Sequence, residues 1–522
     1  MKKYLEKIEH IATRPIGLLA AYWISLTVAA LFVLPIILAN TDYIDDSARR
    51  IGGYYDWGSL GRFVTEALMH LLTFSGNTMA DPGVQMQLLA IPVLAFTGWV
   101  FACFLGHESK MNLGRITVGA LLIVNPYLLT NLSFRFDSLS MILGYALSVV
   151  AGVLVVTNVK RYRIAVGVGL LFLAAALYQP MILMFLITSI ALLVYRYAAE
   201  KGDIFRGILR AGIVFTVAVI FYYGALKVFQ FSNIGGDSRG MLVPFNRDGL
   251  MMVVANFLAG TKTIALFFMS GAGKVIGVSL GLWVIVALVW LVALKYRAQK
   301  WQNSLLTISS PLLITLGIMG PFILMSSALT YQVRTLSTGI GLVLLAGVLV
   351  VAMQHLKLRN ASVFLALPLV FIFYSLNFSQ VYGATLKYQR EYDRIVYDEI
   401  DDSIVDIKPI QEGGTVYIGG VASSPLSIRA LYEKRPLLER MDIAGDNTIW
   451  FLWHSLNNMH ATKSTIWFVY SKEQQEARSA VCRQANKGLV ETNAYFSIYR
   501  AESGEHYIWL TDPIVDANNF CN

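Results

Sequence analysis

The feature that most constrains this chain is the recurrence of long apolar runs. Runs of about 18 or more residues return repeatedly between residues 16 and 380. The 522 residues are 56% hydrophobic and 14% charged, whereas soluble domains carry roughly 25% charged residues. Because a helix satisfies its backbone hydrogen bonds within itself, these runs predict an all-α polytopic membrane protein.

We expect about eleven transmembrane helices. The first run is too long for the apolar region of a signal peptide and lacks a clear small-x-small cleavage site, so we expect it to be retained. Residues 249–270 predict a surface-lying or re-entrant helix. The expected spans are residues 16–38, 84–105, 115–131, 138–157, 164–180, 181–195, 211–230, 272–294, 305–328, 335–353 and 361–380.

Basic residues alternate between the predicted loops and indicate the orientation of the chain. Every second loop is rich in Lys or Arg, beginning with the N-terminus. The positive-inside rule therefore predicts a cytoplasmic N-terminus and, after an odd number of spans, a C-terminal region on the outer side of the membrane. The net charge of +9 follows this loop bias and does not suggest a nucleic-acid partner.

The composition changes near residue 386, which predicts two domains. Residues 1–385 form the membrane domain and residues 386–522 a small soluble α/β domain. Residues 388–406 and 471–487 are helix-like, and Trp450, Trp453 and Trp467 are either core residues or sugar-stacking residues. The β-like runs, rich in β-branched and aromatic residues, are 415–418, 464–470, 495–500 and 506–510.

The sequence lacks the motifs of several common classes of nucleotide-binding, metal-binding and hydrolytic proteins. There is no Walker A pattern, no HExxH, no CxxC and no GxSxG. Cys103 lies in an apolar run and is interpreted as a packed thiol, while the sequence leaves open whether Cys482 and Cys521 pair. No metal ligand set is predicted, and the sequence leaves open whether a divalent cation takes part.

The segment from Thr41 to Arg62 follows the first apolar run and concentrates charge. It combines the acidic pair Asp45 and Asp46 with Arg49, Arg62 and several aromatic residues. One interpretation is a solvated loop with an interfacial aromatic belt. The other is a reaction site at the outer mouth of the first membrane helix.

Three further cations lie close to predicted outer helix ends. These are Arg135, Lys262 and Arg334, which act either as interfacial anchors or as binding groups for an anionic headgroup. Transfer of an activated sugar needs a carboxylate to take the hydroxyl proton and cations to neutralise the leaving phosphate. The outer side of this chain supplies both kinds of group.

These residues also carry a family resemblance. The stretch IDDSARRIGGYYDWGSLGR resembles the first external loop of the serotype-converting O-antigen glucosyltransferases, the Gtr type II family, which are membrane glycosyltransferases of the GT-C type. Residues Asn125–Met141 (NPYLLTNLSFRFDSLSM) and Leu177–Pro180 (LYQP) are also similar to that family. The resemblance covers roughly residues 15 to 380.

The resemblance implies inverting-type transfer of glucose from undecaprenyl-phosphate glucose onto O-antigen repeat units at the periplasmic face of the bacterial inner membrane, which would make the C-terminal domain periplasmic. By analogy Asp45 is the base. Because adjacent residues on a helix point about 100° apart, Asp46 is assigned either to orienting Arg49 or a neighbouring backbone, or to a helix-end or salt-bridge role. The family also implies the lipid bilayer as a partner and a functional link to a flippase and a donor-synthesising glucosyltransferase. The candidates for binding the substrate or its lipid phosphate are Arg49, Arg62, Arg135, Asp137, Gln179, Lys262 and Arg334.

Two alternatives remain at this point. A flippase or transporter would carry ionisable residues near mid-span and related halves with interrupted helices, whereas the charges here cluster at span ends. An O-antigen polymerase or a transferase for a different sugar is harder to separate by sequence. A polymerase would be expected to have a large external loop in mid-chain, and the largest external region here is C-terminal.

Overall fold

The structure of the chain is a computed structural model. The described residues are 2–106, 110–157, 160–199, 203–229, 242–295, 300–326, 332–358, 361–407, 410, 413–420, 424–441, 443–444, 446–459, 465–468, 489–500 and 504–510.

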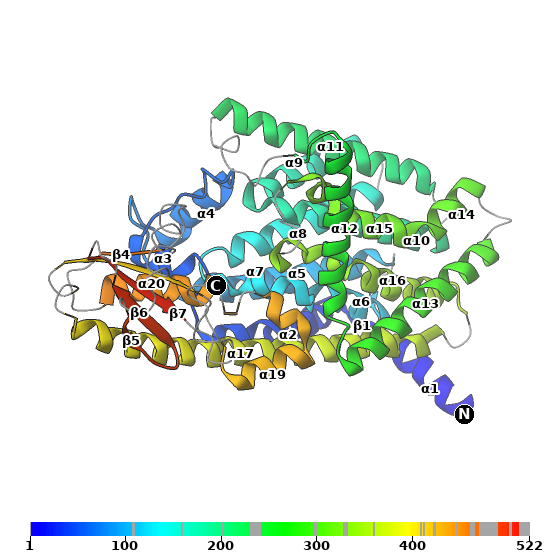
Figure 1. Ribbon diagram of the computed structural model, residues 1–522. Helices are drawn as coiled ribbons and strands as arrows, with labels where there is room; N and C mark the ends of the chain where they lie inside the picture. Colours follow the sequence, from blue (N-terminus) through cyan, green and yellow to red (C-terminus); the bar gives the residue numbers. More distant parts are fainter. Residues whose placement is uncertain are drawn as a thin grey trace.

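Among these residues, ten helical segments are long and apolar enough to cross a membrane. Figure 1 shows most of them running side by side in one direction. They are α2 (Leu18–Ala39), α5 (Gln85–Phe104), α6 (Leu113–Ile123) with α7 (Leu129–Ser133), α8 (Ser138–Thr157), η2 (Gln179–Ile182) with α10 (Leu183–Ala199), α11 (Ile204–Phe229), α12 (Arg247–Leu266), α13 (Gly271–Lys295), η8 (Ser337–Ile340) with α16 (Gly341–His355), and η9 (Ala361–Leu365) with α17 (Ala366–Val405).

Each of the eleven predicted spans coincides with helix. The predicted span 164–180 is α9 (Arg161–Leu177), and 305–328 is a broken pair. In that pair, α14 (Trp301–Ile308) meets α15 (Ser310–Met319) and the following 3-10 turn at a bend of 54°. Pro311 follows the break and cannot donate a backbone hydrogen bond. The prediction of a helical multi-pass membrane protein is confirmed.

Helix α12 differs from the other long helices in direction. Its length and composition would allow it to cross a membrane, but Figure 1 shows it running across the direction of α10 and α17. This orientation fits the surface-lying or re-entrant helix that the sequence predicts. Only four of its 20 residues are buried.

Several short elements were not predicted. They are α1 (Lys2–Thr13), the antiparallel pair β1 (Ile16–Gly17) and β2 (Lys110–Met111), α3 (Asp46–Gly52) and α4 (Phe63–Thr73). Helices of 7 and 11 residues fall below the length at which an apolar period is distinctive. Both α3 and α4 belong to the segment after α2 that carries the candidate site.

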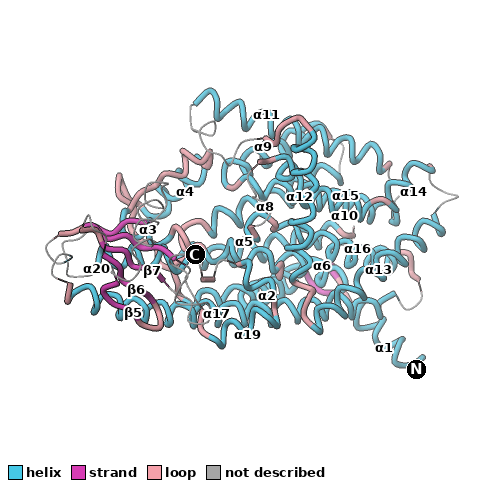
Figure 2. Tube along the Cα trace, viewed as in Figure 1, coloured by secondary structure: helices cyan, strands magenta, loops and turns pink. Residues whose placement is uncertain are grey.

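The C-terminal part contains a mixed sheet of five strands in the order β4-β3-β7-β6-β5. Figure 2 shows it beside α20 (Asp446–Met459) at one end of the molecule. Strand β5 was not predicted, and the predicted helix 471–487 lies outside the described residues. The strands are β3 (Thr415–Gly420), β4 (Thr465–Phe468), β5 (Leu489–Thr492), β6 (Phe496–Arg500) and β7 (His506–Leu510).

Helix α17 belongs to both parts of the chain. It is 40 residues long, so the predicted domain boundary at residue 385 falls inside a continuous helix. Its first half is apolar and packs on α2, while Val396, Ile400 and Ile404 recur at helical spacing and enter the core of the C-terminal domain. The C-terminal domain is therefore built directly onto a membrane helix.

Candidate active site

The candidate site lies at the end of the bundle that carries α3, α4 and the sheet, opposite the N-terminus (Figure 1). Helix α2 ends at Asn40, whose φ of 48° is left-handed, as is common at helix ends. Ile44 has the same φ, an uncommon conformation for a β-branched residue. The chain thereby turns back and starts α3 at Asp46, with Asp45 as the residue before it.

Asp45 is partly exposed. Its backbone carbonyl accepts the N–H of Arg49, and its side chain makes no capping hydrogen bond to α3. Its carboxylate forms no hydrogen bond or ion pair with the described part of the chain. Of the acidic pair, Asp45 is therefore the member whose oxygens remain available to a substrate.

Asp46 has the opposite surroundings, since only 1% of it is exposed. One of its oxygens, Oδ2, accepts the N–H of Tyr43 at 3.0 Å and the N–H of Arg135 at 2.9 Å. It thus ties the loop after α2 to the loop before α8. Burial raises the pKa of the Asp46 carboxyl well above its usual range, and the Arg135 N–H opposes that shift.

This pKa gives Asp46 a predicted effect on stability. Because the pKa is raised on folding, the folded protein binds the proton more tightly than the unfolded chain. The free energy of unfolding should therefore fall as the pH rises from about 4, the ordinary Asp value, through the raised value. Asp46→Asn keeps a carbonyl oxygen for both N–H groups and should remove this pH dependence in thermal unfolding measured in detergent. An unchanged pH dependence in Asp46→Asn would contradict this assignment.

Asp42, next to the acidic pair, lies at the centre of an ion-pair cluster. Its carboxylate is 2.8 Å from Arg50, 3.0 Å from Arg135 and 3.3 Å from Arg390, and its side chain is 3% exposed. Ser47 also donates to it. Arg390 comes from α17, so the cluster joins the loop after α2 to the C-terminal part. Asp42 is thereby enclosed by cations of the protein itself.

Asp42→Asn should destabilise the protein, because it leaves three guanidinium groups facing one another. Removing one partner of a buried ion pair costs about 3–5 kcal/mol, and we expect about 3 kcal/mol since solvent reaches Arg50. The measurement is thermal unfolding of the purified protein in detergent. Asp56→Asn removes an exposed carboxylate of the same segment and should leave the transition in place. Equal transitions in both variants would show that the cluster adds no stability.

A second chain of contacts runs from α3 toward α9. The guanidinium of Arg49 donates to the carbonyl of Tyr55 at 2.7 Å and lies 3.9 Å from the centre of the Trp57 ring. The indole N–H of Trp57 donates to Asp137 at 2.5 Å, and Asp137 lies 3.6 Å from Arg62. Both Trp57 and Asp137 are buried. Arg49, Asp137 and Arg62 thus form one connected set one helical turn from Asp45.

Arg62 also joins the set to α9 and α11. It donates to Gln179 at 3.4 Å and stacks over Tyr178 at 4.6 Å. The amide of Gln179 donates to the carbonyl of Leu60 and to the hydroxyl of Tyr222, each at 2.8 Å. The Arg62 side chain remains 21% exposed. Arg62 is therefore held in place by its neighbours while part of its guanidinium stays open.

Two glycines allow the segment between α2 and α4 to fold this closely. Gly53 has a φ of +59°, and a Cβ there would lie 2.4 Å from Thr78. Gly61 has a φ of +76°, and a Cβ there would lie 2.6 Å from the Tyr222 hydroxyl. Only glycine meets both conditions at low cost. The glycines that flank the Asp-Trp turn are thus explained by packing against neighbouring segments.

The remaining predicted cations have different surroundings. Arg135 pairs with Asp42 and lies 3.7 Å from Asp81. Arg334 is half-buried, donates a hydrogen bond to the side-chain oxygen of Gln332 and lies 5.7 Å from the ring of Phe134, which places it next to the Arg135 loop. Lys262 is exposed on α12, and none of the described contacts joins it to the other predicted residues.

The C-terminal part covers the acidic loop. The hydroxyl of Tyr43 donates to the carbonyl of Met441 at 2.6 Å, and α20 packs on α3. Burial and the nearby Arg50 lower the pKa of His454 on α20 to about 4, so it is neutral at neutral pH. Trp453 packs against the C-terminal core, whereas the side chains of Trp450 and Trp467 lie outside the described residues.

The residues that complete the site include some that the sequence analysis did not single out. Tyr222 lies in an apolar span, and Tyr178 precedes Gln179 at the end of α9. Trp57 was noted only as part of an aromatic cluster. Their roles depend on contacts between distant segments, for which the sequence holds no spacing signal. Over the described residues, no group of three or more His, Cys, Asp or Glu side chains has the arrangement of a metal site.

Comparison with known proteins identifies the family of the chain. A family model described as glucosyl transferase GtrII matches residues 34–337, more than half of the chain and the part that holds all the predicted site residues. A protein of Salmonella phage P22, described as an uncharacterized 55.3 kDa protein in the gtrB 5′ region, is 26% identical over 159 residues. That match spans 30% of this chain and 31% of the phage protein. No solved structure matches. The chain belongs to the glucosyl transferase GtrII family.

Proposed function

We propose that this protein transfers glucose from a polyprenyl-phosphate-linked donor to O-antigen repeat units at the periplasmic face of the bacterial inner membrane. Membership of the GtrII family supports glucosyl transfer. The helical bundle supports a donor whose tail lies in the bilayer. Undecaprenyl-phosphate glucose is the donor that the family resemblance implies.

One observation carries the proposal: an available carboxylate lies beside a set of cations at one end of the membrane helices. Asp45 is partly exposed, and one helical turn away begins the connected set of Arg49, Asp137 and Arg62. A base next to fixed cations is what sugar transfer from a phosphate needs.

In the proposed reaction a hydroxyl oxygen of the acceptor sugar attacks the anomeric carbon of the donor glucose. The new glycosidic bond forms as the bond from that carbon to the phosphate oxygen breaks. Asp45 takes the hydroxyl proton, and the polyprenyl phosphate leaves with the bonding electrons. A single displacement of this kind inverts the anomeric centre. Arg62, with Arg49 behind it, balances the negative charge that grows on the leaving phosphate.

The C-terminal domain is proposed to shape access for the acceptor. It packs on α3 through α20 and contacts the acidic loop through Met441. A large acceptor must therefore approach Asp45 past this domain.

The proposal is tested by O-antigen analysis of cells that express the wild-type chain or the Asp45→Asn variant. Wild-type cells should carry an added glucose of defined linkage on each repeat unit, and the variant should lack it. Purified protein in liposomes should give the same product from undecaprenyl-phosphate glucose. A different sugar, or lengthening of the O-antigen without a side-branch, would refute the proposal in favour of another transferase or a polymerase.

The proposed topology leads to a labelling prediction. In a background without the native cysteines, Glu433→Cys should react with a membrane-impermeant thiol reagent in cells with a permeable outer membrane. Glu433 is exposed on α19 (Leu426–Lys434). Lys300→Cys, which precedes α14 and is also exposed, should react only after the inner membrane is opened. The reverse pattern would put the site on the cytoplasmic side.

A further inference from the structure

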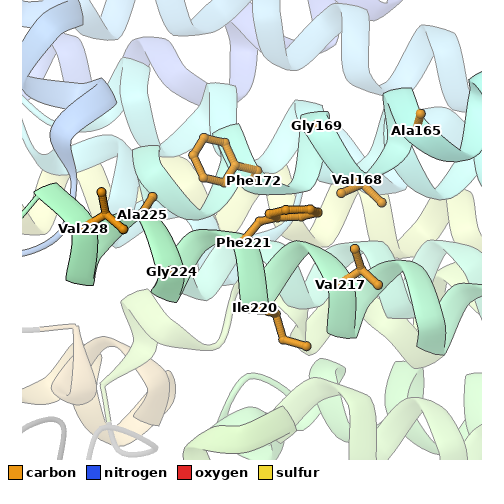
Figure 3. A pocket seen from close by; sticks show the side chains of 10 residues that line it. All are labelled: Ala165, Val168, Gly169, Phe172, Val217, Ile220, Phe221, Gly224, Ala225 and Val228. Carbon is orange, nitrogen blue, oxygen red and sulfur yellow. The ribbon is translucent and has the colours of Figure 1, made fainter.

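A groove runs between α9 and α11 on the surface of the membrane bundle. It has a volume of about 830 Å³ and only apolar residues line it. Figure 3 shows Phe172 of α9 and Phe221 of α11 projecting between the two helices. Its lining extends along both helices, from Ala165 to Phe172 and from Val217 to Val228. The shape suits a long apolar chain rather than a compact ligand.

One end of the groove adjoins the candidate active site. Phe172, which lines it, contacts the ring of Phe63 at a centroid distance of 6.1 Å, and Phe63 directly follows Arg62. On α11, Tyr222 lies between the lining residues Phe221 and Gly224 and hydrogen-bonds Gln179 and the carbonyl of Gly61. The apolar groove therefore ends at the residues that hold Arg62.

Charge complementarity indicates what fills the groove. Arg62 is partly exposed, and its nearest carboxylate is 3.6 Å away, so an anionic group can approach the guanidinium. An apolar channel that ends at a cation matches a molecule with one long hydrocarbon tail and one phosphate.

We infer that the groove between α9 and α11 holds the polyprenyl chain of the donor lipid and directs its phosphate to Arg62. This inference rests on the proposed function, since it names where the tail of the proposed donor lies. It assigns the groove to the donor lipid and not to the tails of the surrounding phospholipids.

Two glycines make the groove testable. A Cβ added at Gly169 on α9 or at Gly224 on α11 would meet nothing within 4 Å, and both residues line the groove. The backbone at both positions therefore accommodates a side chain, and Gly169→Trp and Gly224→Trp should each place an indole ring in the groove. Gly212 is also on α11 with open space around it but lies outside the groove, so Gly212→Trp is the matched control.

The first experiment compares glucose transfer from undecaprenyl-phosphate glucose with transfer from a ten-carbon prenyl analogue. The wild type and Gly212→Trp should prefer the long donor. Both groove variants should raise the KM for the long donor about tenfold while keeping the kcat with the short one. Retention of the full chain-length preference in both groove variants would overturn the inference.

The second experiment does not depend on glucose transfer. A photoreactive polyprenyl phosphate without sugar should label α9 or α11 peptides, and undecaprenyl phosphate should suppress the labelling. If undecaprenyl phosphate suppresses the labelling but the first experiment yields no glucosylated product, the proposed function is refuted and the assignment of the groove stands. If a photoreactive phospholipid labels the same peptides equally and undecaprenyl phosphate does not compete, the groove takes bulk lipid and the inference fails.

Discussion

Asp45→Asn is expected to reduce glucose transfer by about 10²–10⁴-fold, the usual contribution of a general base. The change keeps the size of the side chain and removes its ability to accept a proton. Since the Asp45 carboxylate is partly exposed and makes no capping hydrogen bond to α3, the fold should not depend on its charge. The measurement is the rate of transfer per amount of membrane-inserted protein, with both substrates saturating.

Asp46→Asn is the matched control for this prediction, because it makes the same chemical change one residue away. Its amide can still accept the N–H groups of Tyr43 and Arg135 that Asp46 accepts, so much of the transfer activity should survive. If instead Asp46→Asn is inactive and Asp45→Asn works normally, the two roles are exchanged. If both variants remain active, the base lies elsewhere, and Asp137 becomes the next candidate.

The membrane helices could be predicted from the sequence because hydropathy over about 18 residues is a local property. Each predicted span coincides with helix, and β3, β4, β6 and β7 lie where β-branched and aromatic runs indicated. The short helices α3 and α4 were not predicted, because seven or eleven residues are too few to show a distinct helical spacing of apolar residues. The boundary at residue 385 follows a change in composition, but α17 continues through it with its apolar face turned to a second core.

The site could be predicted only in part. Its acidic and basic residues stand close together in one segment, but their partners come from far along the chain. Trp57 and Asp137 are 80 residues apart, and Asp42 and Arg390 are 348 apart. The helical period separates the directions of Asp45 and Asp46 by about 100°, yet it does not say which of them faces inward. That depends on the backbone N–H of Arg135, a contact across segments.

Arg62→Gln is expected to lower the kcat for glucose transfer by about 10²–10³-fold. Loss of one hydrogen-bonding group that stabilises the charge of the transition state has an effect of this size in other enzymes. Glutamine can still hydrogen-bond Gln179 but carries no charge toward the phosphate. Arg62→Lys keeps the charge and loses the planar stack on Tyr178, so it should recover part of the rate. The measurement is kcat in liposomes at saturating donor, with unfolding temperature recorded for each variant.

A second variant separates the role of Arg62 toward the phosphate from its role toward Asp137. Arg62→Gln leaves the buried Asp137 with the Trp57 indole N–H but without its cation, which could by itself distort the site. Combining it with Asp137→Asn removes that unpaired charge. If Arg62 serves mainly to neutralise Asp137, the double variant should regain transfer. If Arg62 balances charge on the leaving phosphate, the double variant should recover stability but remain about as slow as Arg62→Gln, and this is the result we expect.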